Sequence, residues 1–359
     1  MPRLTDIIIQ SIQNNGPISF RDFMEMALYY PDLGYYVSEG DKIGNSGDYF
    51  TSPTLTPMFG EFICKQIIEM WQMLGEKRFA IIEYGAGNGF LCRDILESLQ
   101  NNFSMYDNLD YFIIEKSCSM REKQKKILPK KVQWIENIHQ LSNISGCILS
   151  NELIDNFAVH AVVMQDELME VFIDYDNEFC ELQKSADENL KNYFTELGII
   201  LPRGFRTEVN LQALQWIKEI AEVLQKGFVL TIDYGCTSDE LYSSNKRCGS
   251  VLCYHKHTIN DSPFKNIGEQ DITAHVNFSA LKLWGNKNNL QCCGYTSQAQ
   301  FLRSLGIMNK LREMESEKNP DIIKLKTLVF DMGQKIKLMV QQKGLKRNFL
   351  TGLQFQLPV

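Results

Sequence analysis

Hydrophobic residues recur with different periods along the chain, and each period predicts a type of element. Before residue 76, apolar residues lie three or four positions apart in three segments, which predicts helices over 4–14, 20–30 and 58–74. Residues 31–57 show little period and are rich in glycine, serine, threonine, proline and aromatic residues. A loop of this length is either disordered or functional, and its aromatic residues favour an ordered loop.

From residue 79 onward, short apolar runs alternate with amphipathic segments. This alternation is typical of α/β proteins with a parallel sheet that is covered by helices on both faces. The runs predict strands over 79–84, 109–115, 131–135, 146–150 and 228–234, and the segments predict helices over 89–100, 117–128 and 207–226.

The alternation is interrupted at 159–174, where a hairpin is expected, and again at 235–276. We therefore expect an N-terminal helical region over 1–75 and a core over 76–359, with insertions near 159–206 and 235–276. The last part of the core is expected to contain a helix at 277–289, a strand near 291–297, a helix at 298–304 and a strand at 334–343.

Composition excludes several classes of function. The formal charge is −7, and the densest basic stretch, 121–131, is interpreted as the solvated face of a helix, so nucleic acid is not the expected substrate. The ten cysteines include no C-x-x-C pair, which argues against zinc and favours reduced thiols in a cytosol-like compartment. No apolar run approaches the ~20 residues that span a bilayer, and the first residues resemble no signal or transit peptide. We expect a bacterial cytoplasmic protein, or a mitochondrial matrix protein if the source is eukaryotic.

Glycines occupy every second position after the strand predicted at 79–84, in the segment EYGAGNG. Gly85 would permit a sharp turn, and Gly87 would let the backbone approach a ligand closely. Dinucleotide sites use the spacing G-x-G-x-x-G and place a diphosphate at the helix N-terminus, where the Glu83 carboxylate would repel it. A ligand with an ammonium and a sulfonium is favoured instead. We therefore expect S-adenosyl-L-methionine, held by Glu83, Gly85, Ala86 and Gly87.

Acidic and polar residues also follow the next two predicted strands. Glu115 would accept hydrogen bonds from the two ribose hydroxyls of an adenosine and would reject a 2′-phosphate. Glu136, Asn137 and Ile138 would flank the adenine ring. A single acid after a strand could equally be a solvated loop residue, but the ordered occurrence of Glu83 and Glu115 after successive strands favours a cofactor site.

The exit of the fourth predicted strand, LSNELIDNF (149–157), contains Asn151, Glu152 and Asp155. Open α/β sheets bind ligands at this edge. Glu152 and Asp155 would share one face of a helix, and acids beside a methyl donor suit a cationic acceptor such as an amine or a guanidinium. We expect Glu152 and Asp155 to be catalytic, by orienting the acceptor, and Asn151 to contact the cofactor. The alternative is a helix N-terminus capped by Asn151. Asp233 could orient a substrate cation or cap a turn.

Histidines and aspartates within the second interruption invite a metal interpretation, but their spacing matches no standard site. Methyl transfer to nitrogen needs no metal, so we expect no metal site. A structural role, or a place in the wall of the acceptor cleft, is expected for His255, His257, Asp261, Asp271 and His275.

These stretches resemble the MidA-type family of S-adenosylmethionine-dependent methyltransferases over nearly the whole chain. The resemblance is carried by IIEYGAGNGFLCRDIL, FIIEKS and SNELIDNFAVH, and most specifically by GDYFTS and DITAHVNF. It implies a class I methyltransferase (Rossmann-like) fold with a seven-stranded doubly wound sheet, an N-terminal helical extension and inserted segments. Eukaryotic members are mitochondrial complex I assembly factors that methylate arginine on a complex I subunit. The resemblance therefore implies a protein arginine N-methyltransferase whose partner is a protein.

The resemblance also implies that part of the long loop folds over the cofactor as a lid and excludes water. The lid residues would be Gly47, Asp48, Phe50 and Thr51. The acidic motif departs from the family by having Leu153, Ile154 and residues 156–158 where an aromatic pair and a proline are common, which alters the lining of the acceptor pocket. Tyr84 and Asn88 also depart from the family, but the glycine spacing is kept.

Other functions remain open at this stage. An NAD-dependent oxidoreductase would share the sheet but not the glycine spacing, and Glu83 argues against it. A SAM-binding assembly factor without turnover would have the same fold, and a small-molecule methyltransferase is open because nothing fixes the size of the acceptor. We expect no nucleic acid and no membrane as partner, and a homodimer is open.

Overall fold

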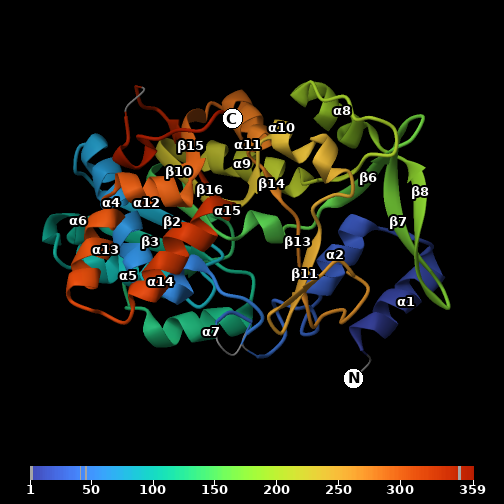
Figure 1. Ribbon diagram of the computed structural model, residues 1–359, viewed down its shortest axis with the longest axis horizontal. Coiled ribbons are helices and arrows are strands. Elements are labelled where there is room, and N and C mark those ends of the chain that lie inside the picture. The colour runs from blue at the N-terminus through green and yellow to red at the C-terminus, as the bar shows by residue number, and fades with distance from the viewer. Residues whose placement is uncertain (1–2, 41, 45–46, 347–348) are drawn as a thin grey trace. The chain divides into compact units, whose positions relative to one another are not determined.

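The computed structural model describes residues 3–40, 42–44, 47–346 and 349–359, and the chain divides into two compact units (Figure 1). Each unit has its own cluster of buried apolar side chains. Unit 1 consists of Met1–Tyr49, Ile154–Gln215 and Cys236–Leu281. Unit 2 consists of Phe50–Leu153, Trp216–Gly235 and Lys282–Val359.

Unit 2 is built around a sheet that contains the strands predicted from the apolar runs. They lie in the order β15 (Gln291–Ser297), β16 (Ile336–Lys343), β10 (Leu224–Cys236), β5 (Ile144–Asn151), β2 (Phe79–Tyr84), β3 (Leu109–Ile114) and β4 (Val132–Ile135). Strands β10, β5, β2, β3 and β4 run parallel to one another, whereas β16 is antiparallel to both β10 and β15. The carboxyl ends of the parallel strands therefore meet at one edge of the sheet, where α/β proteins bind ligands.

Helices pack on this sheet through apolar faces. Phe59, Ile63 and Ile67 lie on one face of α4 (Met58–Met73) and are fully buried, and each contributes about 1.5–3 kcal/mol by leaving water. α4 packs on β5 and on α5 (Phe90–Leu99). The other helices of unit 2 are α3 (Ser52–Leu55), α6 (Phe103–Asp107), α7 (Cys118–Ile127), α12 (Gln298–Ser304), α13 (Ile307–Ser316), α14 (Ile322–Lys326) and α15 (Gly333–Lys335). Two more helices, α9 (Leu211–Val223) and α11 (Phe278–Lys287), have residues in both units.

The predicted helix over 207–226 is wrong at both ends. Residues Arg206–Val209 form strand β9, which pairs with β6 (His160–Met164), and Leu224 pairs with Ile144 as the first residue of β10. Pairing with strands that are distant in the sequence outweighs the local helical period at these positions.

Unit 1 combines short and medium-length helices with two small sheets. β7 (Leu168–Asp176) pairs with β6 in the predicted hairpin, and it also pairs with β1 (Ile18–Ser19) and β8 (Glu178–Ser185). Ser19 caps helix α2 (Phe20–Tyr29), because Ser19 Oγ accepts the Asp22 N–H at 3.0 Å. The remaining elements are α1 (Leu4–Asn15), α2 (Phe20–Tyr29), α8 (Glu188–Leu197), α10 (Ser238–Leu241), β11 (Leu252–His255), β12 (Thr258–Asn260), β13 (Asp271–Thr273) and β14 (Val276–Asn277).

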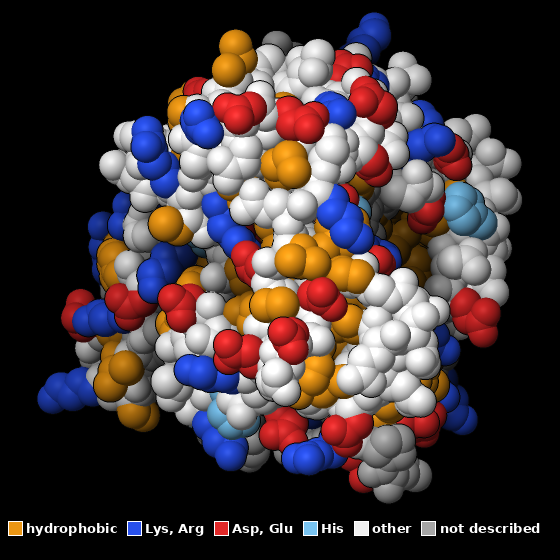
Figure 2. All heavy atoms as spheres, turned by 90° about the vertical axis from the view of Figure 1, so that its right-hand side faces the viewer, with side chains coloured by type: hydrophobic (Ala, Val, Ile, Leu, Met, Phe, Trp, Pro, Cys, Tyr) orange, Lys and Arg blue, Asp and Glu red, His pale blue; other side chains and the backbone are white. Residues whose placement is uncertain are grey.

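Lysine and arginine side chains are interspersed with aspartate and glutamate on the face shown in Figure 2. All ten cysteines lie in the described residues as free thiols. Within these residues, no helix combines the length and the apolar character that crossing a membrane requires.

Candidate active site

The glycine segment forms a tight left-handed turn between β2 and α5. Gly85, Gly87 and Gly89 have φ values of 64°, 52° and 81°, a region that side-chain-bearing residues rarely adopt. A Cβ on Gly85 would also lie 2.6 Å from Leu153 Cδ1, so this turn passes directly beside the exit of β5. The predicted strand–turn–helix is confirmed, and the turn lies at the carboxyl edge of the sheet.

Glu83 is the acid that precedes the turn. Its side chain is buried, and Oε2 accepts the Tyr111 hydroxyl at 2.6 Å. Burial raises the pKa of the Glu83 carboxyl to about 7, the Tyr111 hydrogen bond opposes this shift, and the charge of Glu115 adds to it. A cation near Glu83 would favour its ionised form, whereas a diphosphate would oppose it. Glu83 therefore suits a positively charged ligand.

Glu115 follows β3 and is also buried. Its Oε1 accepts the Ser117 N–H at 3.0 Å, and its Oε2 accepts Gln124 Nε2 at 3.1 Å. Burial raises the pKa of Glu115, and both hydrogen bonds oppose this rise. The carboxylate is thus held in one orientation rather than solvated as a loop residue, as a contact to ribose hydroxyls would need.

The residues after β4 differ in their exposure. Ile138 is buried, whereas Glu136 and Asn137 are exposed. Asn137 Oδ1 accepts the His139 N–H at 3.1 Å and caps a short 3₁₀ helix, Ile138–Gln140. Contact of these residues with an adenine stays a prediction.

The exit of β5 brings a carboxyl group to the same edge. Glu152 has a φ of 50°, and its Oε1 accepts the Ser52 N–H at 2.9 Å and Asn151 Nδ2 at 3.2 Å. Burial raises the pKa of Glu152 to about 8, these two hydrogen bonds oppose the rise, and the charge of Asp233 adds to it. A cation that binds beside Glu152 would therefore lower its pKa and favour loss of its proton.

The helical interpretation of this exit is wrong. β5 ends at Asn151, and the 3₁₀ helix begins only at Ile154, so helical spacing does not put Glu152 and Asp155 on one face. Asn151 is not an N-cap either, because its buried Oδ1 accepts no hydrogen bond from the described residues. An orphaned buried acceptor at a ligand-binding edge suits a donor that comes with a ligand.

Asp233 caps backbone groups at the same edge. Its side chain is fully buried, Oδ2 accepts the Leu153 N–H at 3.1 Å, and Oδ1 accepts the Tyr234 N–H at 2.9 Å. Of the two roles left open by the sequence, these contacts favour the capping of a turn.

The four lid residues are divided between the units. In unit 1, a Cβ on Gly47 would collide with the Lys42 backbone, while Asp48 accepts hydrogen bonds from the Tyr35 hydroxyl at 2.7 Å and the Lys256 N–H at 2.5 Å. In unit 2, Phe50 is exposed and Thr51 is buried, next to the residue whose N–H binds Glu152. Contact of these four residues with a cofactor stays a prediction.

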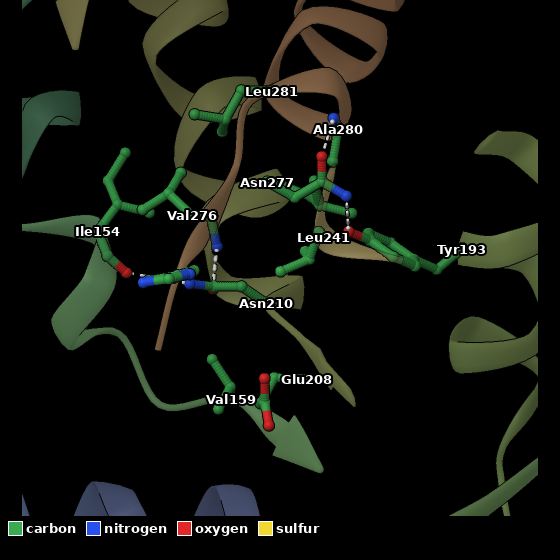
Figure 3. A pocket seen from close by; sticks show the side chains of 13 residues that line it. Ile154, Val159, Tyr193, Glu208, Asn210, Leu241, Val276, Asn277, Ala280 and Leu281 are labelled. Carbon is green, nitrogen blue, oxygen red and sulfur yellow. Dashed lines mark hydrogen bonds between the residues drawn. The ribbon is translucent and has the colours of Figure 1, made fainter. Parts of the chain in front are cut away.

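Asp155 belongs to unit 1 and is buried, with its carbonyl accepting the Ala274 N–H at 2.9 Å. The neighbouring Ile154 lines the cavity of Figure 3, where its carbonyl accepts Asn210 Nδ2 at 3.1 Å. The volume of this cavity is about 10 Å³, which is the size of one water molecule and too small for a substrate.

The residues considered for a metal site make other contacts. His255 Nδ1 lies 2.8 Å from the Glu269 carbonyl, and Asp271 Oδ1 accepts the Tyr36 hydroxyl at 2.8 Å. Burial lowers the pKa of His275 to about 4, and the charge of Lys246 adds to this shift. Among the described residues, no group of three or more His, Cys, Asp or Glu is placed to hold a metal ion.

Sequence reasoning missed two side chains that hold the site together. Tyr111, inside β3, binds Glu83, and Gln124, inside the basic stretch of α7, binds Glu115. A usable signal existed for Gln124, because it lies one helical turn after the buried Met120 and therefore on the inner face of α7.

A family model of S-adenosyl-L-methionine-dependent methyltransferases matches residues 62–296. The mitochondrial protein arginine methyltransferase NDUFAF7 of Homo sapiens is 25% identical over an alignment of 381 positions, which covers 97% of this chain and 83% of the human protein. The corresponding mitochondrial homologue of Drosophila melanogaster is 24% identical, over 86% of this chain and 76% of its own.

A crystal structure of a Burkholderia thailandensis protein bound to S-adenosyl-homocysteine has the same fold. It superposes with a TM-score of 0.89 at 27% sequence identity, and the superposition covers 98% of this chain and 95% of that one.

Proposed function

Because the chain belongs to the family of S-adenosyl-L-methionine-dependent methyltransferases, and so is an enzyme that uses this cofactor, we propose that its acceptor is an arginine side chain of a protein. The observation that carries the proposal is the Glu152 carboxyl, with its raised pKa, at the ligand-binding edge of the sheet. Relatives named as protein arginine methyltransferases support it. By resemblance, the substrate would be a subunit of a complex I-like assembly.

The residues of unit 2 fit the cofactor. The left-handed glycine turn has no bulky side chain that would keep a ligand from its backbone, and Asn151 Oδ1 is a buried acceptor that suits an ammonium donor. Bound S-adenosyl-L-methionine would supply an electrophilic methyl group on a positively charged sulfur. The residues proposed to hold it are Glu83, Gly85, Ala86, Gly87, Glu115, Glu136, Asn137, Ile138 and Asn151.

The chemical task of the chain is to present a neutral nitrogen lone pair, because arginine stays protonated in water. A carboxylate that binds one side of the guanidinium holds the charge there and leaves another nitrogen nucleophilic. We assign this role to Glu152 and Asp155. Holding the acceptor in line with the methyl group then lowers the barrier through proximity.

The finer organisation follows the same proposal. The strands from β15 to β4 would form the seven-stranded doubly wound methyltransferase sheet, within a core over 76–359 that has insertions near 159–206 and 235–276. Residues 1–75 would form the helical region and the lid, with Gly47, Asp48, Phe50 and Thr51 over the cofactor. A homodimer and a cytoplasmic or matrix location stay predictions, although the named relatives are mitochondrial proteins.

Methyl labelling of cell-extract proteins tests the acceptor. The purified protein is incubated with tritiated S-adenosyl-L-methionine and extract, and the labelled peptide is identified by mass spectrometry. We expect methylarginine in one protein, and at least about tenfold less label with Glu152→Gln. Label on another residue type or on a small molecule would refute the arginine acceptor. Calorimetric cofactor binding without any transfer would instead indicate an assembly factor.

A further inference from the structure

Gln124 is a fully buried polar side chain that the proposed mechanism does not use. It lies on α7, the helix that follows β3. Its Nε2 donates to the Gly87 carbonyl at 2.8 Å and to Glu115 Oε2 at 3.1 Å, while its Oε1 accepts Trp134 Nε1 at 2.8 Å. One amide group therefore joins the glycine turn, the acid after β3 and a side chain of β4.

Chemistry fixes the orientation of this amide. The indole nitrogen of Trp134 can only donate, so it must face the amide oxygen of Gln124. The two N–H groups of Gln124 then face the Gly87 carbonyl and the Glu115 carboxylate, both of which can only accept. A flipped amide would place its oxygen against two acceptors and its N–H groups against a donor. Trp134 thus selects the amide orientation that binds Glu115.

The contact leaves Glu115 held at both oxygens but not saturated. Ser117 N–H binds Oε1, Gln124 binds Oε2 and the Lys116 backbone N–H also binds the carboxylate, whereas a carboxylate can accept about four hydrogen bonds. Gln124 also crowds the turn itself, because a Cβ on Gly89 would lie 3.3 Å from Gln124 Cγ. The side chain therefore fixes the distance between the turn backbone and the carboxylate.

We propose that Gln124 is a positioning residue for the cofactor, which holds the Glu115 carboxylate and the Gly87 carbonyl where they receive the adenosine ribose, and so sets the preference of the site for ribose hydroxyls. The inference rests on the proposed contact between Glu115 and the ribose. Burial raises the pKa of Glu115 and the Gln124 hydrogen bond opposes this rise, so Gln124 also favours the ionised carboxylate, which accepts hydrogen bonds best.

Calorimetry with S-adenosyl-homocysteine and its 2′-deoxy analogue tests this role. Gln124→Met keeps the side-chain volume but removes the three hydrogen bonds. We expect about tenfold weaker binding of S-adenosyl-homocysteine and a smaller preference over the 2′-deoxy analogue. Gln66→Met is the matched control, because Gln66 lies on α4, is equally buried and binds Glu69 and the Gly352 N–H, all outside the glycine turn. It should lose thermal stability but keep the affinity and the preference within about twofold.

The possible outcomes separate this inference from the function. Undiminished preference in Gln124→Met overturns the inference alone, and so does an equal loss of preference in Gln66→Met. If the wild-type protein binds no S-adenosyl-homocysteine, the proposed cofactor site is refuted as well. Should Gln124→Met fail to fold, Trp134→Phe removes the donor that orients the amide, together with part of the ring, and leaves the Gln124 side chain in place. This variant should also lower the preference, and a preference equal to that of the wild type would overturn the inference.

Discussion

Replacing Glu152 by glutamine should remove most of the pH dependence of methyl transfer. The ionised carboxylate is the form that binds a guanidinium, and burial raises the pKa of Glu152 to about 8. With that pKa, the ionised fraction rises from about 1% at pH 6 to about 90% at pH 9, which is roughly 90-fold. The sulfonium of the cofactor favours the carboxylate and lowers this pKa. Even a pKa of about 7 leaves a rise of about 11-fold over the same range.

The quantity to measure is kcat/KM for the acceptor peptide found by methyl labelling, at saturating cofactor, from pH 6 to pH 9. Saturation removes the titration of Glu83, whose pKa of about 7 would otherwise overlap. The arginine acceptor stays protonated over this range and adds no slope of its own.

The two variants have opposite expected outcomes. Glu152→Gln should have a nearly flat profile and fall at least about tenfold below the wild type at pH 9. Glu97→Gln is the control, because it removes the same charge from an exposed position on α5 and should leave the slope unchanged. A wild-type profile that is flat from pH 6 to pH 9, or an equal slope in Glu152→Gln, would refute the role of this carboxyl group.

Three further predictions concern binding and stability. Gly85→Ala places a side chain at a φ of 64°, and the new Cβ would lie 2.6 Å from Leu153 Cδ1. This variant should lower the free energy of unfolding by roughly 1–2 kcal/mol and weaken S-adenosyl-homocysteine binding in calorimetry. An unchanged affinity and unfolding temperature would contradict this prediction. Tyr111→Phe removes the hydrogen bond that lowers the pKa of Glu83, so the ionisation of Glu83, followed by carbon NMR, should shift above pH 7, and a downward shift would count against it. Burial raises the pKa of Asp271 to about 7, so the contribution of this carboxyl group to stability is full below its unfolded pKa of about 4 and is lost as the pH rises through 7. Asp271→Asn should therefore show a smaller drop in melting temperature between pH 5 and pH 8 than the wild type. An equal drop in both proteins would refute this role of Asp271.

The pattern of apolar and polar residues was sufficient to predict an element where residues close in the sequence determine its structure. β2 and α5 lie within a residue of their predicted ends, because an unbroken apolar run, a glycine turn and an amphipathic face identify them. β8 was missed, because most of its side chains are exposed and it lacks an apolar period. Strand β9 was missed because its pairing partner β6 is about 45 residues away and competes with a helical period.

The acids of the site were predictable, but the groups that hold them were not. Glu83, Glu115 and Glu152 follow or end parallel strands, and the edge at which such strands end is known from the topology alone. Tyr111 and Gln124 act through partners 28 and 9 residues away, which only the packed sheet brings within hydrogen-bond distance. The positive φ of Glu152, at the end of β5, could not be predicted from the residue type, because glutamate rarely adopts this conformation.

A buried carboxyl group destabilises a fold unless something compensates its charge. Unit 2 gathers Glu83, Glu115 and Glu152 near one sheet edge, and burial raises the pKa of each. The hydrogen bonds from Tyr111 to Glu83 and from Gln124 to Glu115 offset only part of this cost of burial, since the pKa of both carboxyl groups remains raised. The missing compensation is positive charge, and a ligand carrying a sulfonium and an ammonium, together with a guanidinium acceptor, would supply it at this edge. The same carboxyl groups that weaken the ligand-free protein above neutral pH would then strengthen its complex, which is the behaviour expected when a fold gives up stability for binding.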